Sequence, residues 1–126
     1  MDATPRPARL AVGVISAGRV GSVLGAALAR TGHVVVGTSA VSQASRNRAE
    51  ELLPGAPIED PTEVARRADL VLLGVPDDEL EGLVKGLVAT DSVRAGQIVV
   101  HASGAQGVKV LEHAAGLGAL TLALHP

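Results

Sequence analysis

The chain contains no cysteine, phenylalanine, tryptophan or tyrosine, and each absence excludes a class of site. Without cysteine there are no disulfides and no thiolate metal ligands, which favours a reducing compartment. Without aromatic rings there is no stacking platform of the kind that binds single-stranded nucleic acid. The hydrophobic 47% of the 126 residues is almost entirely Ala, Val, Leu and Ile, so these residues must form the core.

Net charge and long apolar runs are also scarce. A formal net charge of −2 gives no basic footprint for DNA or RNA. No run reaches the roughly 18 uncharged apolar residues of a membrane-spanning helix, and the N-terminus shows no apolar targeting segment. We therefore expect a cytoplasmic protein without membrane or nucleic-acid partners. Residues 1–9 are predicted to be a disordered tail and residues 10–126 a single domain.

Short apolar runs alternate along the chain with segments of helical spacing. Because the runs do not alternate polar and apolar residues, they predict parallel strands that are buried on both faces by helices. This pattern predicts an α/β fold with a doubly wound parallel sheet of about six strands, in spatial order 3-2-1-4-5-6. The expected strands are Leu10–Ile15, Val34–Thr38, Pro57–Ile58, Leu70–Val75, Gln97–His101 and Ala119–Leu124.

Residues that start and stop helices separate these runs. Arg19–Arg30 carries an apolar stripe at helical spacing, and Gly32 is expected to end that helix. Further helices are predicted from an N-cap at Asp60 with Pro61 following, from an N-cap at Asp77, over Gln43–Leu53 and over Gly107–Ala115.

The first strand turns into the first helix through Ser16-Ala17-Gly18-Arg19-Val20-Gly21. A diphosphate binds where the backbone can approach closely and free N–H groups point out of a helix N-terminus. Gly18 would permit that approach, and Gly21 would let the helix pack close to the strands. A glycine pair is weak evidence alone, but its place between an apolar strand and an amphipathic helix predicts a dinucleotide site.

Ser16 departs from the usual G-x-G-x-x-G pattern, in which its position is the first glycine. Either Ser16 tolerates a backbone conformation that favours glycine or the turn differs. Its hydroxyl could donate to a phosphate oxygen or could weaken binding. A glycine-rich turn that holds no ligand is the alternative interpretation.

Four segments together resemble a known family: the glycine turn, Val75-Pro76-Asp77, His101-Ala102-Ser103-Gly104-Ala105 and His125-Pro126. They resemble the Rossmann-like domain of oxidoreductases related to the 6-phosphogluconate dehydrogenase superfamily. Deazaflavin-dependent NADP oxidoreductases and ketopantoate reductases are similar but more distant. The resemblance covers Leu10 to Pro126 and implies a nicotinamide cofactor. In that group a helical domain of uncertain function follows, and this chain is expected to lack it.

The second strand favours NADP over NAD as the cofactor. An NAD site places an acid at the end of this strand, but no Asp or Glu occurs between Ser22 and Ala49. Small hydroxyls at Thr38 and Ser39, with guanidinium groups nearby, suit a 2′-phosphate instead. The guanidinium groups are those of Arg46 and Arg48, for which solvated positions on a helix are the alternative.

Other candidate site residues lie at the carboxyl ends of the strands. Arg19 would contact phosphate or line the surface, and Val75 and Pro76 would meet the ribose unless Pro76 only sets the loop. The catalytic residues are unknown. The candidates are His101 and His125, for proton relay or substrate binding or else for loop hydrogen bonding, and Ser103, for lining the nicotinamide or substrate side.

Two other kinds of site are excluded for these residues. Ser103 is not a hydrolase nucleophile, because the G-x-S-x-G elbow would need glycines where His101 and Ala105 stand. No His-x-x-x-His spacing or cluster of acids predicts a metal site.

The sequence thus predicts an NADP(H)-binding domain of an oxidoreductase that transfers hydride with an unknown small substrate. One alternative is a non-catalytic module that binds or senses NAD(P) together with a partner. A homodimer, or a partner supplying the missing helical domain, is expected in that case. A decayed fold without ligand is a third interpretation, since it would account for Ser16.

Overall fold

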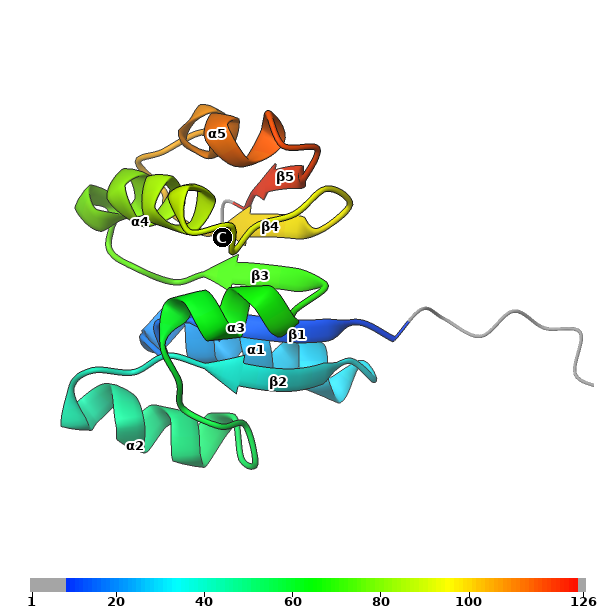
Figure 1. Cartoon of the computed structure of the whole chain (residues 1–126). Coiled ribbons are helices and arrows are strands. Elements are labelled where there is room, and N and C mark those ends of the chain that lie inside the picture. The colour runs from blue at the N-terminus through cyan, green and yellow to red at the C-terminus, as the bar shows by residue number, and fades with distance from the viewer. Residues whose placement is uncertain (1–8, 125–126) are drawn as a thin grey trace, which may run out of the picture.

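Within residues 9–124, which the computed structural model describes, five parallel strands form one sheet in the order β2-β1-β3-β4-β5. Figure 1 shows the strands side by side with helices around them. The parallel pairing and the order confirm the predicted α/β class. The strands are β1 (Ala11–Ile15), β2 (Val34–Thr38), β3 (Leu70–Leu73), β4 (Ile98–His101) and β5 (Leu120–Ala123).

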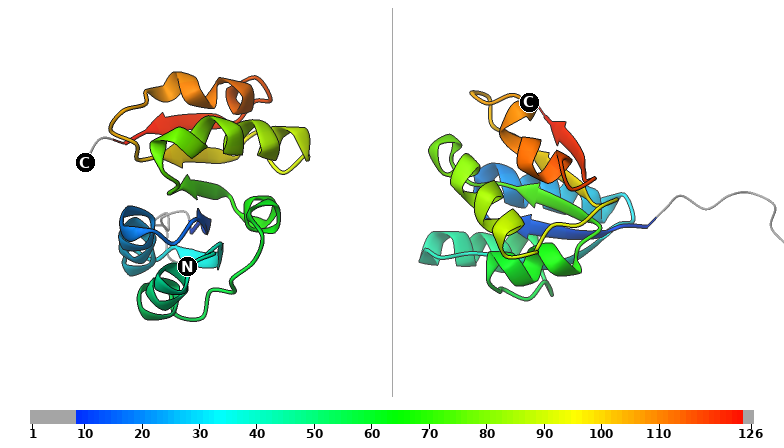
Figure 2. Two further views of the ribbon diagram at one scale, coloured as in Figure 1. Left: turned by 90° about the vertical axis from the view of Figure 1, so that its left-hand side faces the viewer. Right: turned by 45° about the horizontal axis from the view of Figure 1, so that its top comes forward.

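Helices lie on both sides of the sheet. Figure 2 shows α1 on one side and α4 on the other. None of the helices in residues 9–124 is long and apolar enough to cross a membrane. They are α1 (Arg19–Arg30), α2 (Gln43–Leu52), α3 (Pro61–Arg67), α4 (Asp77–Ala89) and α5 (Glu112–Ala115), with a 3-10 turn, η1 (Val108–Leu111), before α5.

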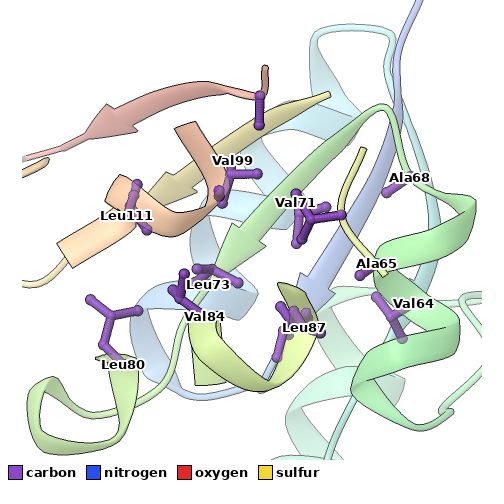
Figure 3. Packing of buried hydrophobic residues seen from close by; sticks show 14 residues of the cluster. Val64, Ala65, Ala68, Val71, Leu73, Leu80, Val84, Leu87, Val99 and Leu111 are labelled. Carbon is purple, nitrogen blue, oxygen red and sulfur yellow. The ribbon is translucent and has the colours of Figure 1, made fainter. Parts of the chain in front are cut away.

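Neighbouring residues of β1, β3 and β4 contribute to different hydrophobic clusters, because side chains alternate between the faces of a sheet. Val71, Leu73 and Val99 pack with α3, α4 and α5 in one cluster (Figure 3). Val14 and Leu72 pack with α1 in the other. The sheet is thus anchored from both faces, and the strand ends that carry the site are held in a fixed register.

The third expected strand, Pro57–Ile58, is reduced to a single parallel bridge between Ile58 and Thr38 of β2. The Thr38 N–H donates to the Pro57 carbonyl at 3.0 Å, and the Glu59 N–H donates to the Thr38 carbonyl at 2.9 Å. Pro57 itself has no N–H to donate, and α3 begins at Pro61, so the pairing cannot extend. The other five strands keep the predicted order.

Helix boundaries follow the predictions with two corrections. Helix α1 has the predicted ends, and Gly32 takes a φ of +101° just beyond it. Asp77 is the first residue of α4 rather than its N-cap, because Pro76 is extended and occupies the cap position. The predicted helix over Gly107–Ala115 is divided into η1 and α5, each of four residues.

Strand β5 is not buried on both faces as the apolar pattern predicted. Leu120, Leu122 and Leu124 are exposed by 60%, 52% and 44%. β5 lies at the sheet edge, where Leu122 is in register with Val100 on the α1 side of the sheet. Helix α1 packs over β1, β2 and β3, so these leucines lie beyond the layer that it forms.

The expected tail, residues 1–9, lies outside the described residues except for Arg9, and so does the C-terminal His125-Pro126.

Candidate functional site

The turn between β1 and α1 has the conformation that a glycine normally provides. Ser16 takes a φ of +72°, in the left-handed region that is unfavourable for residues with a Cβ atom. Gly18 is the N-cap of α1, in an extended conformation, and no side chain caps the helix there. Of the two options for Ser16, the structure therefore shows a serine that adopts the glycine-like turn.

Ser39 ties this turn to the end of β2. The Ser16 N–H donates to the Ser39 hydroxyl at 2.7 Å, and the Ala17 N–H donates to the Ser39 carbonyl at 2.8 Å. The amides of Ser16 and Ala17 are therefore not available to a ligand, contrary to the expectation for the whole turn. The amides that remain lie at residues 18–20, at the N-terminus of α1, where helical N–H groups have no partner within the helix.

The glycines near the turn differ in the space available around their Cα atoms. A Cβ atom on Gly21 would lie 2.7 Å from the Ser16 carbonyl oxygen, and one on Gly74 would lie 2.8 Å from the same atom. A Cβ on Gly18 would meet nothing nearer than the Gly74 carbonyl oxygen at 3.5 Å. Gly21 and Gly74 are thus required by packing, whereas Gly18 leaves open the space in front of the helix.

Two hollows meet at this turn and share Ser16, Gly18 and Val75 in their linings. The β2-side hollow, of about 610 Å³, extends from the turn to the start of α2. The β4-side hollow, of about 350 Å³, extends to the ends of β3 and β4. Ligand sites commonly measure about 300–1,000 Å³, so the pair forms an elongated cleft with the N-terminus of α1 at its middle.

A family model described as the Rossmann-like domain matches residues 1–126, the whole chain. The chain belongs to this family. No curated protein matches it in sequence.

Solved structures share the fold. A 3-hydroxyisobutyrate dehydrogenase from Mycobacterium tuberculosis aligns with a TM-score of 0.76 at 19% identity over 92% of this chain. An imine reductase from Streptomyces aurantiacus gives 0.66 at 25% identity over 90%. One from Myxococcus stipitatus, in complex with NAD+, gives 0.68 at 22% identity over 93%. This chain spans only 40–41% of the length of those three chains.

Only one of the two arginines proposed to bind a 2′-phosphate lines the β2-side hollow. Arg48 is half-buried in its lining and donates weakly to the Ala17 carbonyl, with 3.4 Å between Nη1 and O. Arg46 instead lines another hollow, with Glu59, Asp60 and Glu63. Of these two arginines, Arg48 is therefore the one that faces the β2-side hollow.

Thr38, Ala17 and Gly21 are absent from the linings of both hollows. The Thr38 side chain is fully buried and donates to the Val14 carbonyl at 2.8 Å. Thr38 therefore holds β1 and β2 together and does not reach the cleft, while Ala17 is fully buried beneath the turn. Ser39 lines the β2-side hollow, as expected.

The β4-side hollow brings together residues from three strand ends. Its lining includes Arg19, Val20, Val75, Pro76 and Ser103, all of which were expected at the site. Ser103 is only 7% exposed. Among the described residues, its hydroxyl has no hydrogen-bond partner.

His101 lies at the end of β4 and is fully buried. Its Nδ1 accepts from the Ser103 N–H at 3.0 Å, and its Nε2 lies 2.8 Å from the Gly107 carbonyl. Both ring nitrogens are therefore hydrogen-bonded to the loop that follows β4. His101 thus has the predicted role in loop hydrogen bonding. His125, the other candidate for proton relay, lies outside the described residues.

Several lining residues were missed by the sequence analysis. Ser42, the N-cap of α2, and Ser45 line the β2-side hollow, together with Glu79 from α4. Gly74 lines the β4-side hollow and packs under the turn. A glycine directly after the apolar run Leu70–Leu73 was the available indication for Gly74. No sequence pattern places Glu79 in the same lining as the residues that follow β2, because this depends on how α4 packs relative to β2.

Charged groups outside the cleft form ordinary surface pairs. The hydrogen bond and charge of Lys85 hold the pKa of Glu81 below its usual value, with 2.9 Å between Nζ and Oε1. No group of three or more His, Asp or Glu residues that could hold a metal ion occurs within residues 9–124.

The left-handed conformation of Ser16 should reduce the stability of the folded chain. Ser16→Gly is expected to raise the free energy of unfolding by about 1 kcal/mol, because a left-handed conformation costs a non-glycine residue about 1–3 kcal/mol and the added chain entropy of glycine offsets about 0.5–1 kcal/mol of that. Urea unfolding should be followed by far-UV circular dichroism, since the chain has no aromatic fluorophore. A less stable variant would contradict this account of the turn.

Proposed function

We propose that the chain is the NADP(H)-binding domain of an oxidoreductase that transfers hydride to or from a small substrate. One observation carries the proposal: the N-terminus of α1, with Gly18 at its cap, lies where the two hollows meet. A dinucleotide has two nucleoside halves joined by a diphosphate, so its shape and charge distribution match this cleft. The nicotinamide dinucleotide named with one similar structure agrees with this ligand class.

The adenosine half is assigned to the β2-side hollow and the nicotinamide half to the β4-side hollow. In doubly wound sheets the adenosine ribose lies near the end of β2, whereas the other half crosses the switch point towards the remaining strands. Here β1 lies between β2 and β3 in the sheet, which places that switch point at the glycine turn. When bound, the nicotinamide ring would supply or accept the hydride.

The residues of the chain orient the cofactor rather than carry the redox chemistry. The amides of residues 18–20 would donate to the diphosphate, and the positive end of the α1 dipole would favour its charge. Val75 and Pro76 give the β4-side hollow an apolar wall at the end of β3. Such a wall would support one face of a ring and keep water from it.

NADP is proposed over NAD on the composition of the β2-side hollow. Ser42 caps α2 by accepting the Ser45 N–H at 3.1 Å, so the positive end of this helix lies in the same lining as Arg48. A 2′-phosphate would meet a guanidinium group, hydroxyls and a helix N-terminus together. The carboxylate in the described lining, Glu79, comes from α4 rather than from the end of β2, where an NAD site places its acid.

Arg48→Ala is expected to weaken NADPH binding about tenfold and to leave NADH binding unchanged. A charge-assisted hydrogen bond contributes about 1.5–3 kcal/mol, and NADH lacks the phosphate that would receive it. Arg46→Ala is the matched control, since Arg46 lies on the same helix but lines a different hollow. Isothermal titration calorimetry measures the affinities of the unaltered chain and of both variants for each cofactor.

The outcomes separate the two levels of the proposal. Equal affinity of the unaltered chain for NADPH and NADH would refute the 2′-phosphate assignment but would leave a nicotinamide dinucleotide domain. Failure to bind either cofactor would refute the proposed function.

A further inference from the structure

The loop after β4 is organised around the buried ring of His101. A carbonyl oxygen can only accept, so the Nε2 that lies 2.8 Å from the Gly107 carbonyl must carry a hydrogen. Nδ1 accepts the Ser103 N–H at 3.0 Å, so it carries none. His101 is therefore a neutral imidazole of defined tautomer. It fixes the loop at two points, Ser103 and Gly107.

The fixed loop presents one polar atom that the protein leaves unused. Ser103 is 7% exposed, its Oγ has no partner among the described residues, and it lines the β4-side hollow. Buried hydroxyls in folded proteins are nearly always hydrogen-bonded. An unpaired hydroxyl in a hollow of ligand size indicates that a bound ligand supplies its hydrogen-bond partner.

We propose that the Ser103 hydroxyl binds the carboxamide of a nicotinamide ring in the β4-side hollow, and that His101 is the positioning residue that directs this hydroxyl. The inference rests on the proposed function. With the diphosphate at residues 18–20, the group that extends to the ends of β3 and β4 is the ring end of the cofactor. The side chains of Val75 and Pro76 carry no polar atom. The Ser103 hydroxyl both donates and accepts, so it matches either the oxygen or the nitrogen of a carboxamide.

His101 acts through the backbone of the loop. Its Nδ1 accepts a hydrogen bond from the N–H of Ser103, two residues along the chain. This bond fixes the backbone between the two residues and hence the direction of the Ser103 side chain. Without that acceptor the amide would have no partner in a buried position, and the loop would rearrange to satisfy it. His101 contacts Ser103 but is not itself among the residues that line the hollow, so its role is one of positioning.

The first test compares two ligands that differ only in the nicotinamide ring. Ser103→Ala is expected to weaken NADPH binding about tenfold in calorimetry and to change the affinity for 2′-phospho-ADP-ribose less than twofold. Unchanged NADPH affinity would overturn the proposed contact, and so would an equal loss for both ligands. Failure of the unaltered chain to bind NADPH would refute the proposed function instead, so the two failures are distinguishable.

The second test uses two substitutions that each keep one half of the imidazole. The carboxamide oxygen of His101→Asn can replace Nδ1 as the acceptor for Ser103, whereas the amide of His101→Gln can replace Nε2 as the donor to Gly107. NADPH affinity is expected to stay within threefold in the Asn variant and to fall about tenfold in the Gln variant. Equal losses in both would overturn the positioning role, because a merely structural ring would not distinguish its two nitrogens.

A measurement on the unaltered chain keeps the positioning role testable if the histidine variants fail to fold. The ¹⁵N shifts of the His101 ring should show hydrogen on Nε2 and none on Nδ1, both before and after NADPH is added. A ring with hydrogen on Nδ1 would overturn the proposal, because that nitrogen could not then accept from Ser103.

Discussion

Replacing Gly21 by alanine is expected to lower the free energy of unfolding by about 2 kcal/mol. The added Cβ would lie 2.7 Å from the Ser16 carbonyl oxygen, a backbone atom of the turn that cannot rotate away. Overpacking of this kind costs about 1–3 kcal/mol or more, which exceeds the gain of about 1 kcal/mol that alanine brings to a helix. Urea unfolding followed by far-UV circular dichroism measures the change.

Gly82→Ala is the matched control for this substitution. Gly82 lies inside α4, and a Cβ there would meet no atom within 4 Å. The control variant is therefore expected to gain up to about 1 kcal/mol from helix propensity alone. A Gly21 variant as stable as this control would show that α1 does not need its close approach to the turn.

Gly18→Val is expected to reduce NADPH affinity at least tenfold while leaving the fold almost intact. A Cβ at this position has 3.5 Å to its nearest neighbour, and Gly18 lines both hollows, so the side chain would occupy the place assigned to the diphosphate. Loss of glycine at the N-cap costs about 1 kcal/mol or less. Calorimetry with NADPH and urea unfolding of the same sample measure the two effects.

The pair of results identifies the cause of any loss. Weaker binding together with near-normal stability supports a steric block of the ligand. Normal NADPH affinity would mean that the diphosphate does not pass Gly18. Gly21→Ala shows the converse case, since its primary effect is on folding.

The parts of the fold that depend on local sequence were predictable. An apolar run, a glycine turn and an amphipathic stripe are contiguous in the chain, and they placed β1 and α1 with the correct helix ends. The third expected strand was wrong as a full strand because Pro57 and Pro61 leave room for only one bridge. The exposure of β5 was missed because the pattern shows which residues are apolar but not how far α1 extends over the sheet.

The site was predictable only in outline, for a physical reason. Gly18 could be placed because its neighbours in sequence are also its neighbours in space. The bonds from Ser16 and Ala17 to Ser39 span 22 or 23 residues and depend on the register of β1 with β2. Arg46 and Arg48 are two positions apart in α2 and therefore lie on different faces of that helix. Which of the two faces the cleft depends on the rotation of α2 about its axis. The two hydrogen bonds of His101 depend on the path of a loop that no periodic pattern describes.

The proposed cofactor site depends most on the free amides at the start of α1, and an NMR titration of the ¹⁵N-labelled chain with NADPH tests them directly. The amide resonances of Gly18, Arg19 and Val20 are expected to shift as the diphosphate binds. The amide protons of Ser16 and Ala17 should stay protected from exchange by their bonds to Ser39. Saturable binding that leaves the resonances of residues 18–20 in place would contradict the central claim.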